Sequence, residues 1–340
     1  DDDGINNSGT LSLGAGLSLT VQSTSNTAFN QSAGTINFST GANIDVGSQD
    51  FVWRAGSLNG AGSVNGNTVF ATGVKTLDGA SISVGDATLA SGSSLSLLSG
   101  SLTSGGSTFT VNNGADLVVA SNALGSLALT NSGEVDLLNG AVLTGDVNNN
   151  SAGVVNVKAT EATNATVSLG VVTNNAGANF NLGSDSSTAN NVQLNLTSLT
   201  NDGTVSVTAG NGGSRTISGD VINASGATLQ LIDSDLTIND DTGVSNNGTV
   251  SIAANQTLSV VSTTSTAFTQ NNGDIDFAAN STLDVGTNDF VWSAGSLNGN
   301  GTINGNTAFA TGIKALNGAS INVADATLNA GSTLTLQSGV

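Results

Sequence analysis

Short phrases in which apolar and polar residues alternate recur along the chain. Each phrase begins with Gly and continues with any residue, an aliphatic residue, a polar residue and another apolar residue. Such alternation is typical of a strand that buries one face, and the Asn, Ser, Asp and Gly residues before each phrase are typical of turns. The phrases predict strands at residues 9–13, 34–38, 133–137, 153–157, 203–207, 248–252 and 273–277. No segment combines helical periodicity with capping signals, so no substantial helix is expected.

Neighbouring phrases lie roughly 24 residues apart once degenerate copies are allowed for. A strand this short cannot stabilise itself, but coils of two or three such strands bury their apolar sides when they stack. We therefore predict an all-β chain folded as a right-handed parallel β-helix, or β-solenoid, of about 14 coils. Coils about 4.8 Å apart would make a rod roughly 65–70 Å long, with ladders of outward Ser, Thr and Asn residues.

A longer repeat is superimposed on the short one. Residues 51–60 return at 290–299, and this offset of 239 residues holds without a gap from 1/240 to 97/336. We expect residues 1–340 to form one continuous solenoid, with 1–239 as one long unit and 240–340 as the start of the next copy. The positions that define the repeat are Phe51, Trp53, Gly56, Leu58 and Gly60 and, in the second copy, Phe290, Trp292, Gly295, Leu297 and Gly299.

Composition supports a strand-rich repeat. The chain has no Pro, which fits strands that need every backbone N–H, and its 45 Gly residues are expected at turns with positive φ. The formal net charge of −19 disfavours nucleic acid and anionic lipid as partners. No run of 18 apolar residues occurs, so no membrane span is expected in this segment.

Enzymatic chemistry finds little support in the sequence. The chain has no His and no Cys, which excludes Ser-His-Asp and Cys-His arrangements and sites ligated by imidazole or thiolate. A pair of carboxylates could in principle hydrolyse a glycoside, and Asp45 with Asp50 (repeated as Asp284 with Asp289) is the nearest candidate. Lys75 corresponds to Lys314, but a single Lys in this context reads as a solvated turn residue. We expect no catalytic residue and no enzyme activity.

Two binding interpretations concern acidic and aromatic residues. Hard oxygen ligands gathered at a turn could hold Ca²⁺, and the weak candidates are Asp233, Asp235, Asp240 and Asp241, although no known calcium-loop spacing is present. We otherwise expect no cofactor. Trp53 and Trp292 could stack on sugars, but each lies two residues after a Phe, and the alternation favours a place in the core.

The segment from Asp50 to Leu77 resembles the Trp-x-x-Gly-x-Leu-x-Gly-x-Gly repeats of very large bacterial surface proteins. The Asn-x-Gly-Thr-aliphatic phrases resemble coils of filamentous haemagglutinins and autotransporter passenger domains. This resemblance implies an exported, extracellular or cell-surface bacterial protein with a right-handed β-helix, serving as an adhesin stalk, a fibre, a surface layer or a biofilm matrix component. It brings no catalytic residues to this chain.

The expected function is therefore that of a structural segment of a large extracellular repeat protein. We expect its partner to be the same protein, through end-to-end stacking of repeats or lateral bundling, and cell-surface or matrix polysaccharide is a further possible partner. The alternative is a carbohydrate- or surface-binding adhesin module with an outward polar and aromatic stripe. An ice-binding solenoid is weaker, because the Thr residues are too irregularly spaced to form a flat ladder.

Overall fold

A computed structural model describes residues 4–103, 108–120, 124–160, 163–184, 189–321, 328 and 330–337. The described residues form strands and turns, with no helix among them. The chain divides into two compact units. Unit 1 comprises residues 1–155 and 167–169, and unit 2 comprises residues 156–166 and 170–340. The boundary therefore falls inside the long repeat, and each unit is described on its own.

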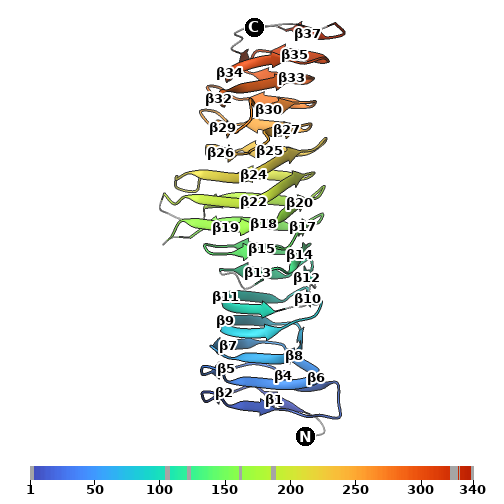
Figure 1. Cartoon of the computed structure of the whole chain (residues 1–340), viewed down its shortest axis with the longest axis vertical. Coiled ribbons are helices and arrows are strands. Elements are labelled where there is room, and N and C mark those ends of the chain that lie inside the picture. Colours follow the sequence, from blue (N-terminus) through green and yellow to red (C-terminus); the bar gives the residue numbers. More distant parts are fainter. Residues whose placement is uncertain are drawn as a thin grey trace. The chain divides into compact units, whose positions relative to one another are not determined.

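Unit 1 consists of short strands that pair in parallel with strands of the next turn. For example, β2 pairs with β5, β5 with β7 and β7 with β9 (Figure 1). The strands of unit 1 are β1 (Ile5–Asn7), β2 (Thr10–Leu13), β3 (Ser18–Thr20), β4 (Thr27–Gln31), β5 (Thr35–Phe38), β6 (Asn43–Trp53), β7 (Gly56–Gly60), β8 (Ser63–Phe70), β9 (Val74–Ser83), β10 (Ala87–Leu89), β11 (Ser94–Thr103), β12 (Thr108–Val111), β13 (Asp116–Val119), β14 (Ala128–Asn131), β15 (Glu134–Leu137), β16 (Val142–Leu143) and β17 (Val147–Asn149). Two strands, β18 (Val154–Ala159) and β19 (Ala165–Leu169), have residues in both units.

Unit 2 repeats the same arrangement of parallel pairs. Here β23 pairs with β25, β25 with β28 and β28 with β31. The strands of unit 2 are β20 (Val171–Asn174), β21 (Asn179–Ser184), β22 (Val192–Asn201), β23 (Thr204–Val207), β24 (Arg215–Asn223), β25 (Thr228–Leu231), β26 (Leu236–Asn239), β27 (Val244–Asn246), β28 (Thr249–Ile252), β29 (Thr257–Val261), β30 (Thr266–Gln270), β31 (Asp274–Phe277), β32 (Thr282–Trp292), β33 (Gly295–Gly299), β34 (Thr302–Phe309), β35 (Ile313–Asn317), β36 (Ser320–Ile321) and β37 (Thr333–Leu336).

This architecture is a parallel β-solenoid, as the alternating phrases predict. Over the residues that the structure describes there are about 14 turns, spaced by about 22 residues. The spacing is slightly shorter than the expected one and varies along the chain. Asn131 and Asn149 on neighbouring turns are 18 residues apart, whereas Asn174 and Asn201 are 27 apart. The loops between strands absorb this variation, because the strands themselves stay in register.

The core of each unit consists of columns of apolar side chains that run from turn to turn. In unit 1, Ile36, Leu58, Leu77 and Leu97 are register partners in succession and are all fully buried. The residues between them along each strand point outward, where polar side chains bond between turns. Asn181 donates to Asn156 at 2.8 Å and Asn298 donates to Asp276 at 2.8 Å. The expected columns and outward ladders are both present.

Glycine allows the turns to approach one another closely at equivalent points of the two copies. Gly60 and Gly299 have φ of 89° and 92°, and a Cβ at either position would lie 2.1 Å or less from the carbonyl oxygen of Phe38 or Phe277. No other residue fits such a position without displacing the neighbouring turn. These two repeat-defining glycines are therefore required by packing as well as by backbone conformation.

Candidate functional site

The most regular polar feature of the molecule is a ladder of buried carboxamides inside unit 2. We call the five residues Asn174, Asn201, Asn223, Asn246 and Gln270 the amide ladder. Each of the first four donates from its side-chain nitrogen to the side-chain oxygen of the next, at 2.7 or 2.8 Å. All five side chains are at most 1% exposed. Because every rung bonds to the next, the ladder joins five successive turns through the core.

Each rung also bonds to backbone groups, either two residues further along the chain or at the start of a strand on the next coil. Asn201 Nδ2 donates to the carbonyl oxygen of Thr228 at 2.9 Å, and Asn201 Oδ1 accepts the backbone N–H of Gly203 at 3.2 Å. Asn174 and Asn223 donate in the same way to Thr204 and Thr249. A buried amide whose donor and acceptor are both used stabilises the fold, whereas an unused one would destabilise it. The amide groups thus hold the turns together.

A column of inward side chains in unit 1 contains shorter amide runs. Asn7 donates to Gln31 at 2.7 Å, and Asn131 donates to Asn149 at 2.8 Å. Between these runs the column is apolar. Trp53 follows Gln31 in register, and Phe70 follows Trp53. In unit 2, Trp292 and Phe309 follow Gln270 in the same order.

The repeat-defining aromatic residues all point into the core. Phe51, Trp53, Phe290 and Trp292 are 0% exposed. Phe51 stacks on Phe29 at a centroid distance of 5.3 Å, and Phe290 stacks on Phe268 at 5.7 Å. Leu58 and Leu297 are equally buried. An indole face that lies inside the core cannot stack on a sugar. The prediction that Trp53 and Trp292 lie in the core is therefore confirmed.

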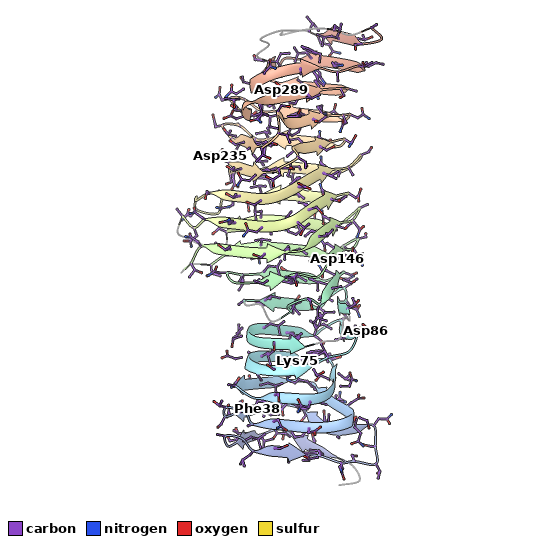
Figure 2. All side chains as sticks on the ribbon, in the orientation of Figure 1. Phe38, Lys75, Asp86, Asp146, Asp235 and Asp289 are labelled. Atoms are coloured by element: carbon purple, nitrogen blue, oxygen red, sulfur yellow. The ribbon has the colours of Figure 1, made fainter. Side chains whose placement is uncertain are left out.

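Lys75 and Lys314 are buried, and the interpretation of these residues as solvated turn residues is wrong. Their exposed fractions are 1% and 0%. Lys75 Nζ donates to the carbonyl oxygen of Gly73 at 2.9 Å. Lys314 Nζ donates to those of Ser293 at 2.8 Å, Ala310 at 2.5 Å and Gly312 at 3.2 Å. Burial lowers the pKa of Lys75 to about 8 and also lowers the pKa of Lys314. Figure 2 labels Lys75 on the ribbon of unit 1.

Arg215 is the third buried cation. Its side chain is 1% exposed and donates to five backbone carbonyl oxygens. Four of the five, those of Thr208, Ala209, Gly212 and Ser214, belong to the loop between β23 and β24. Burial lowers the pKa of the guanidinium, and the charge of Asp233 acts in the opposite direction. Arg215 therefore fastens this loop to the body of unit 2.

The aspartates considered for calcium make hydrogen bonds to the backbone of loops and strands. Asp233 Oδ1 accepts the N–H of Ala209 at 2.7 Å, and Asp235 Oδ1 accepts that of Thr257 at 2.7 Å. Asp240, which is 1% exposed, accepts N–H groups from Val221, Thr242 and Gly243 at 2.8 or 2.9 Å. Over the residues that the structure describes, no three carboxylates gather as they would around a metal ion. Asp241 belongs to no such group either.

The carboxylate pairs considered for glycoside hydrolysis have similar roles. Asp50 Oδ1 accepts from Asn67 Nδ2 at 2.7 Å, and Asp289 Oδ1 accepts from Asn306 Nδ2 at 2.7 Å. Asp45 and Asp284 each accept the N–H of the glycine two residues later at 3.0 Å. Figure 2 shows Asp86 and Asp146 at the edge of unit 1 and Asp235 at the edge of unit 2.

The surface of unit 1 carries one polar group that the second copy does not repeat. Arg54 is exposed, and its Nε donates to Asn30 Oδ1 at 3.2 Å, while Asn30 Nδ2 donates to Asn6 Oδ1 at 3.1 Å. These three side chains help to line a shallow pocket of about 270 Å³. The second copy has Ser293 at the position of Arg54.

Comparison with known proteins found no matching protein family, no similar curated protein and no similar solved structure. The fold and the geometry of the buried polar groups are therefore the basis for a functional conclusion. Within the described part of the chain, no helix is long and apolar enough to span a membrane.

Proposed function

We propose that this chain is a non-enzymatic structural segment of a large extracellular bacterial repeat protein. Its stacked coils would form a rod in a fibre, a surface layer, a biofilm matrix or an adhesin stalk. The observation that carries the proposal is the use of the buried polar groups. The amide ladder, Lys314 and Arg215 donate hydrogen bonds to neighbouring turns, and Lys75 donates to the backbone of its own turn, so these buried groups stabilise the stack of coils.

Parallel stacking suits a protein that must keep its form under load. Each interior strand bonds to a strand on either side of it, and the amide ladder adds a second line of bonds through the core. Pulling two turns apart would break backbone and side-chain bonds together. The surface charge of a chain with a net charge of −19 would limit uncontrolled association of such segments.

The experiment that tests location uses antibodies raised against the recombinant chain. Immunogold labelling of intact cells of the source organism should place the protein outside the cell or on its surface. Labelling confined to the cell interior would overturn the proposal. Treating the cells with an external protease before labelling is the matched control, because it should remove the signal only if the protein is outside.

The alternative is a carbohydrate- or surface-binding module. The aromatic residues considered for this binding surface, Phe51, Trp53, Phe290 and Trp292, are buried and cannot contact a ligand. A polar version remains, based on the hydrogen-bonded surface residues Asn6, Asn30 and Arg54 and the pocket that they help to line. A screen of the chain and its Arg54→Ser variant against neutral and acidic glycans decides the matter. Binding lost in the variant would favour the alternative, and no binding by either protein would remove it.

A further inference from the structure

One step in the stack of unit 1 lacks the strand pairing that joins the steps on either side of it. On this face, strands pair in parallel from β1 through β4 and β6 to β8, and again from β10 through β12 and β14 to β17. Strands β8 and β10 lie on neighbouring turns, because β7 and β9 just before them pair with each other (Figure 1). All residues of β8 and β10 are described, and the two strands do not pair. We call this interruption the seam.

A backbone hydrogen bond between turns is also missing at the seam. In the next turn, Asn112 follows β12 and donates its N–H to the carbonyl oxygen of Leu89 at 3.1 Å. Ala90 follows β10 in the same way. In the described part of the chain, its N–H makes no such bond to the carbonyl oxygen of Phe70 at the end of β8. The series of bonds that links one turn to the next is therefore broken at this step.

The polar side chains at the seam bond away from it. Asn67 Nδ2, on β8, donates to Asp50 Oδ1 on β6 at 2.7 Å. Asp86, just before β10, accepts the N–H of Thr108 on β12 at 3.0 Å. Each side of the seam is thus bonded to the turn behind it, and these side chains do not bridge the two strands.

The seam contains an open pocket and a buried hydroxyl. The pocket has a volume of about 350 Å³ and is lined by residues of both strands, among them Val69 and Thr88. Thr68 also lines it and is 2% exposed, but its Oγ1 has no hydrogen-bond partner among the described residues. A buried polar group without a partner destabilises the packed state, and unfilled space reduces the contact between the turns.

The same two turns are joined on the other side. Strands β7 and β9 pair with Leu58 opposite Leu77, and the first part of β8 pairs with β9 through Val64 and Ile82. The four side chains are at most 1% exposed. The contact between these turns is therefore closed along β7 and β9 and interrupted along β8 and β10.

We propose that the seam is an opening point built into the fold, at which β8 and β10 separate while β7 and β9 stay paired. Local opening requires least free energy where the fewest backbone bonds and buried contacts must be broken. The inference rests on the proposed function and deepens it, because it specifies where a stack of coils under load yields first. The paired strands β7 and β9 keep the turns joined while the seam opens.

The test measures how fast buried thiols at matched positions react under native conditions. The chain has no Cys, so a single substitution supplies the only thiol. Leu89 lies on β10 at the seam, and Leu129 lies on β14, which pairs on both sides. Both leucines are 0% exposed. We expect Leu89→Cys to react with a thiol reagent at least about tenfold faster than Leu129→Cys, after correction for the rate of each unfolded variant.

A second pair of variants makes a smaller change and tests the closed side. Ala87 on β10 is 4% exposed, and Ala80 on β9 of the same turn is 0% exposed. Ala87→Cys should react at least about tenfold faster than Ala80→Cys. This pair decides the matter if the leucine variants do not fold, which urea unfolding of each variant shows.

Equal rates within the pairs would overturn the proposal, and so would faster reaction of Leu129→Cys or Ala80→Cys. Fast reaction of both Ala variants would mean that the whole turn opens, which contradicts the continued pairing of β7 and β9. None of these results bears on where the protein is located. The immunogold test of the proposed function can therefore fail or succeed independently of the seam.

Discussion

Trp292 lies in register with Gln270, directly after the last rung of the amide ladder. Gln270 is one methylene longer than the Asn rungs before it, and its Nε2 turns back to donate to the carbonyl oxygen of Asn272 at 2.6 Å. An indole has a donor and no acceptor, so it cannot continue a ladder of amides. Gln31 and Trp53 stand in the same relationship in unit 1, where Gln31 donates to Ala33. Each copy of the repeat therefore ends an amide run with Gln and begins an aromatic run with Trp.

Burial of the indoles predicts the fluorescence of the chain. Trp53 and Trp292 are its only tryptophans, and both are 0% exposed. Emission should be that of indoles in an apolar surrounding, and iodide should quench it very little until the protein is unfolded. Adding oligosaccharides should leave the emission unchanged. Strong quenching in the folded protein, or a shift on adding a sugar, would contradict this placement and revive the stacking interpretation.

Removing a central rung of the amide ladder should destabilise the fold strongly. Asn201→Leu removes one of the two acceptors of Asn174 Nδ2 and the side-chain donor of Asn223 Oδ1, and it leaves the Thr228 carbonyl without its side-chain partner. Unsatisfied buried groups cost about 1–3 kcal/mol each, so we expect a loss of about 3 kcal/mol or more in the free energy of unfolding by urea.

The matched control for the ladder is Asn181→Ala. Asn181 also donates to an Asn on the neighbouring turn, at 2.8 Å, but it is a half-buried residue of the outer face. Water can replace this bond, so the loss should stay below about 1 kcal/mol. If the two variants lost the same stability, the buried ladder would have no special role.

The buried lysines make stability depend on pH. Burial lowers the pKa of Lys75 to about 8 from its ordinary 10.5, so between these values the unfolded chain binds more protons than the folded chain. Stability therefore rises as the pH increases from about 8 to about 10.5, and below pH 8 the full cost of burying the charge is present. That cost is at most about 3 kcal/mol for Lys75.

Lys75→Met should remove this cost and make the chain more stable at pH 7 by about 1–3 kcal/mol. Lys314 has the same kind of shift, so the double variant with Lys314→Met should show a nearly flat profile across the window. The measurement is urea unfolding at pH 7, 8, 9 and 10. A rise in stability that survived in the double variant would assign the pH dependence to other groups.

Arg215 should be irreplaceable by Lys. Its guanidinium donates from three nitrogens to carbonyl groups that include Asn190, Thr208 and Gly212, and a single ammonium group cannot reach all of them. Arg215→Lys should cost about 2–3 kcal/mol and should accelerate hydrogen exchange in the loop at residues 208–213. Arg54→Ser is the control, because Arg54 is exposed and the second copy has Ser293 there. Equal effects of the two substitutions would contradict the role of Arg215.

The alternating phrases were sufficient to predict the strands and the parallel stack. The phrase at residues 248–252 became β28 (Thr249–Ile252), and the phrase at 34–38 became β5 (Thr35–Phe38). Periodicity succeeds here because an interior strand in a stack of coils must alternate to bury one face. The long repeat was equally informative, since it identified the buried Trp and Phe positions twice.

The interior polar groups could not be predicted with the same ease. Lys75 lies two residues before Leu77 on the same strand, so the alternation alone favours an inward side chain. The charge of a lysine favours the surface instead. The structure places Lys75 inside and leaves Val74 68% exposed. The amide ladder has no distinct signal in the sequence, because Asn is abundant and precedes most phrases, where it also suits a turn. Only register between turns distinguishes a ladder rung from a turn residue.

The central claim is that successive coils stack in parallel and in register, and disulfide cross-linking tests it most directly. The chain has no Cys, so paired substitutions report on chosen positions alone. Thr228 and Thr249 are register partners on β25 and β28, both half-buried, while Ser251 lies two residues further along β28. Register partners lie about 4.8 Å apart, within the range of a disulfide, and the diagonal pair lies roughly 8 Å apart, outside it.

Under mild oxidation, the variant Thr228→Cys with Thr249→Cys should form an intramolecular disulfide nearly completely, as measured by intact mass and peptide mapping. The variant Thr228→Cys with Ser251→Cys should remain reduced under the same conditions. Equal cross-linking of both pairs, or preferential cross-linking of the diagonal pair, would contradict the register on which the stacked coils and the amide ladder depend.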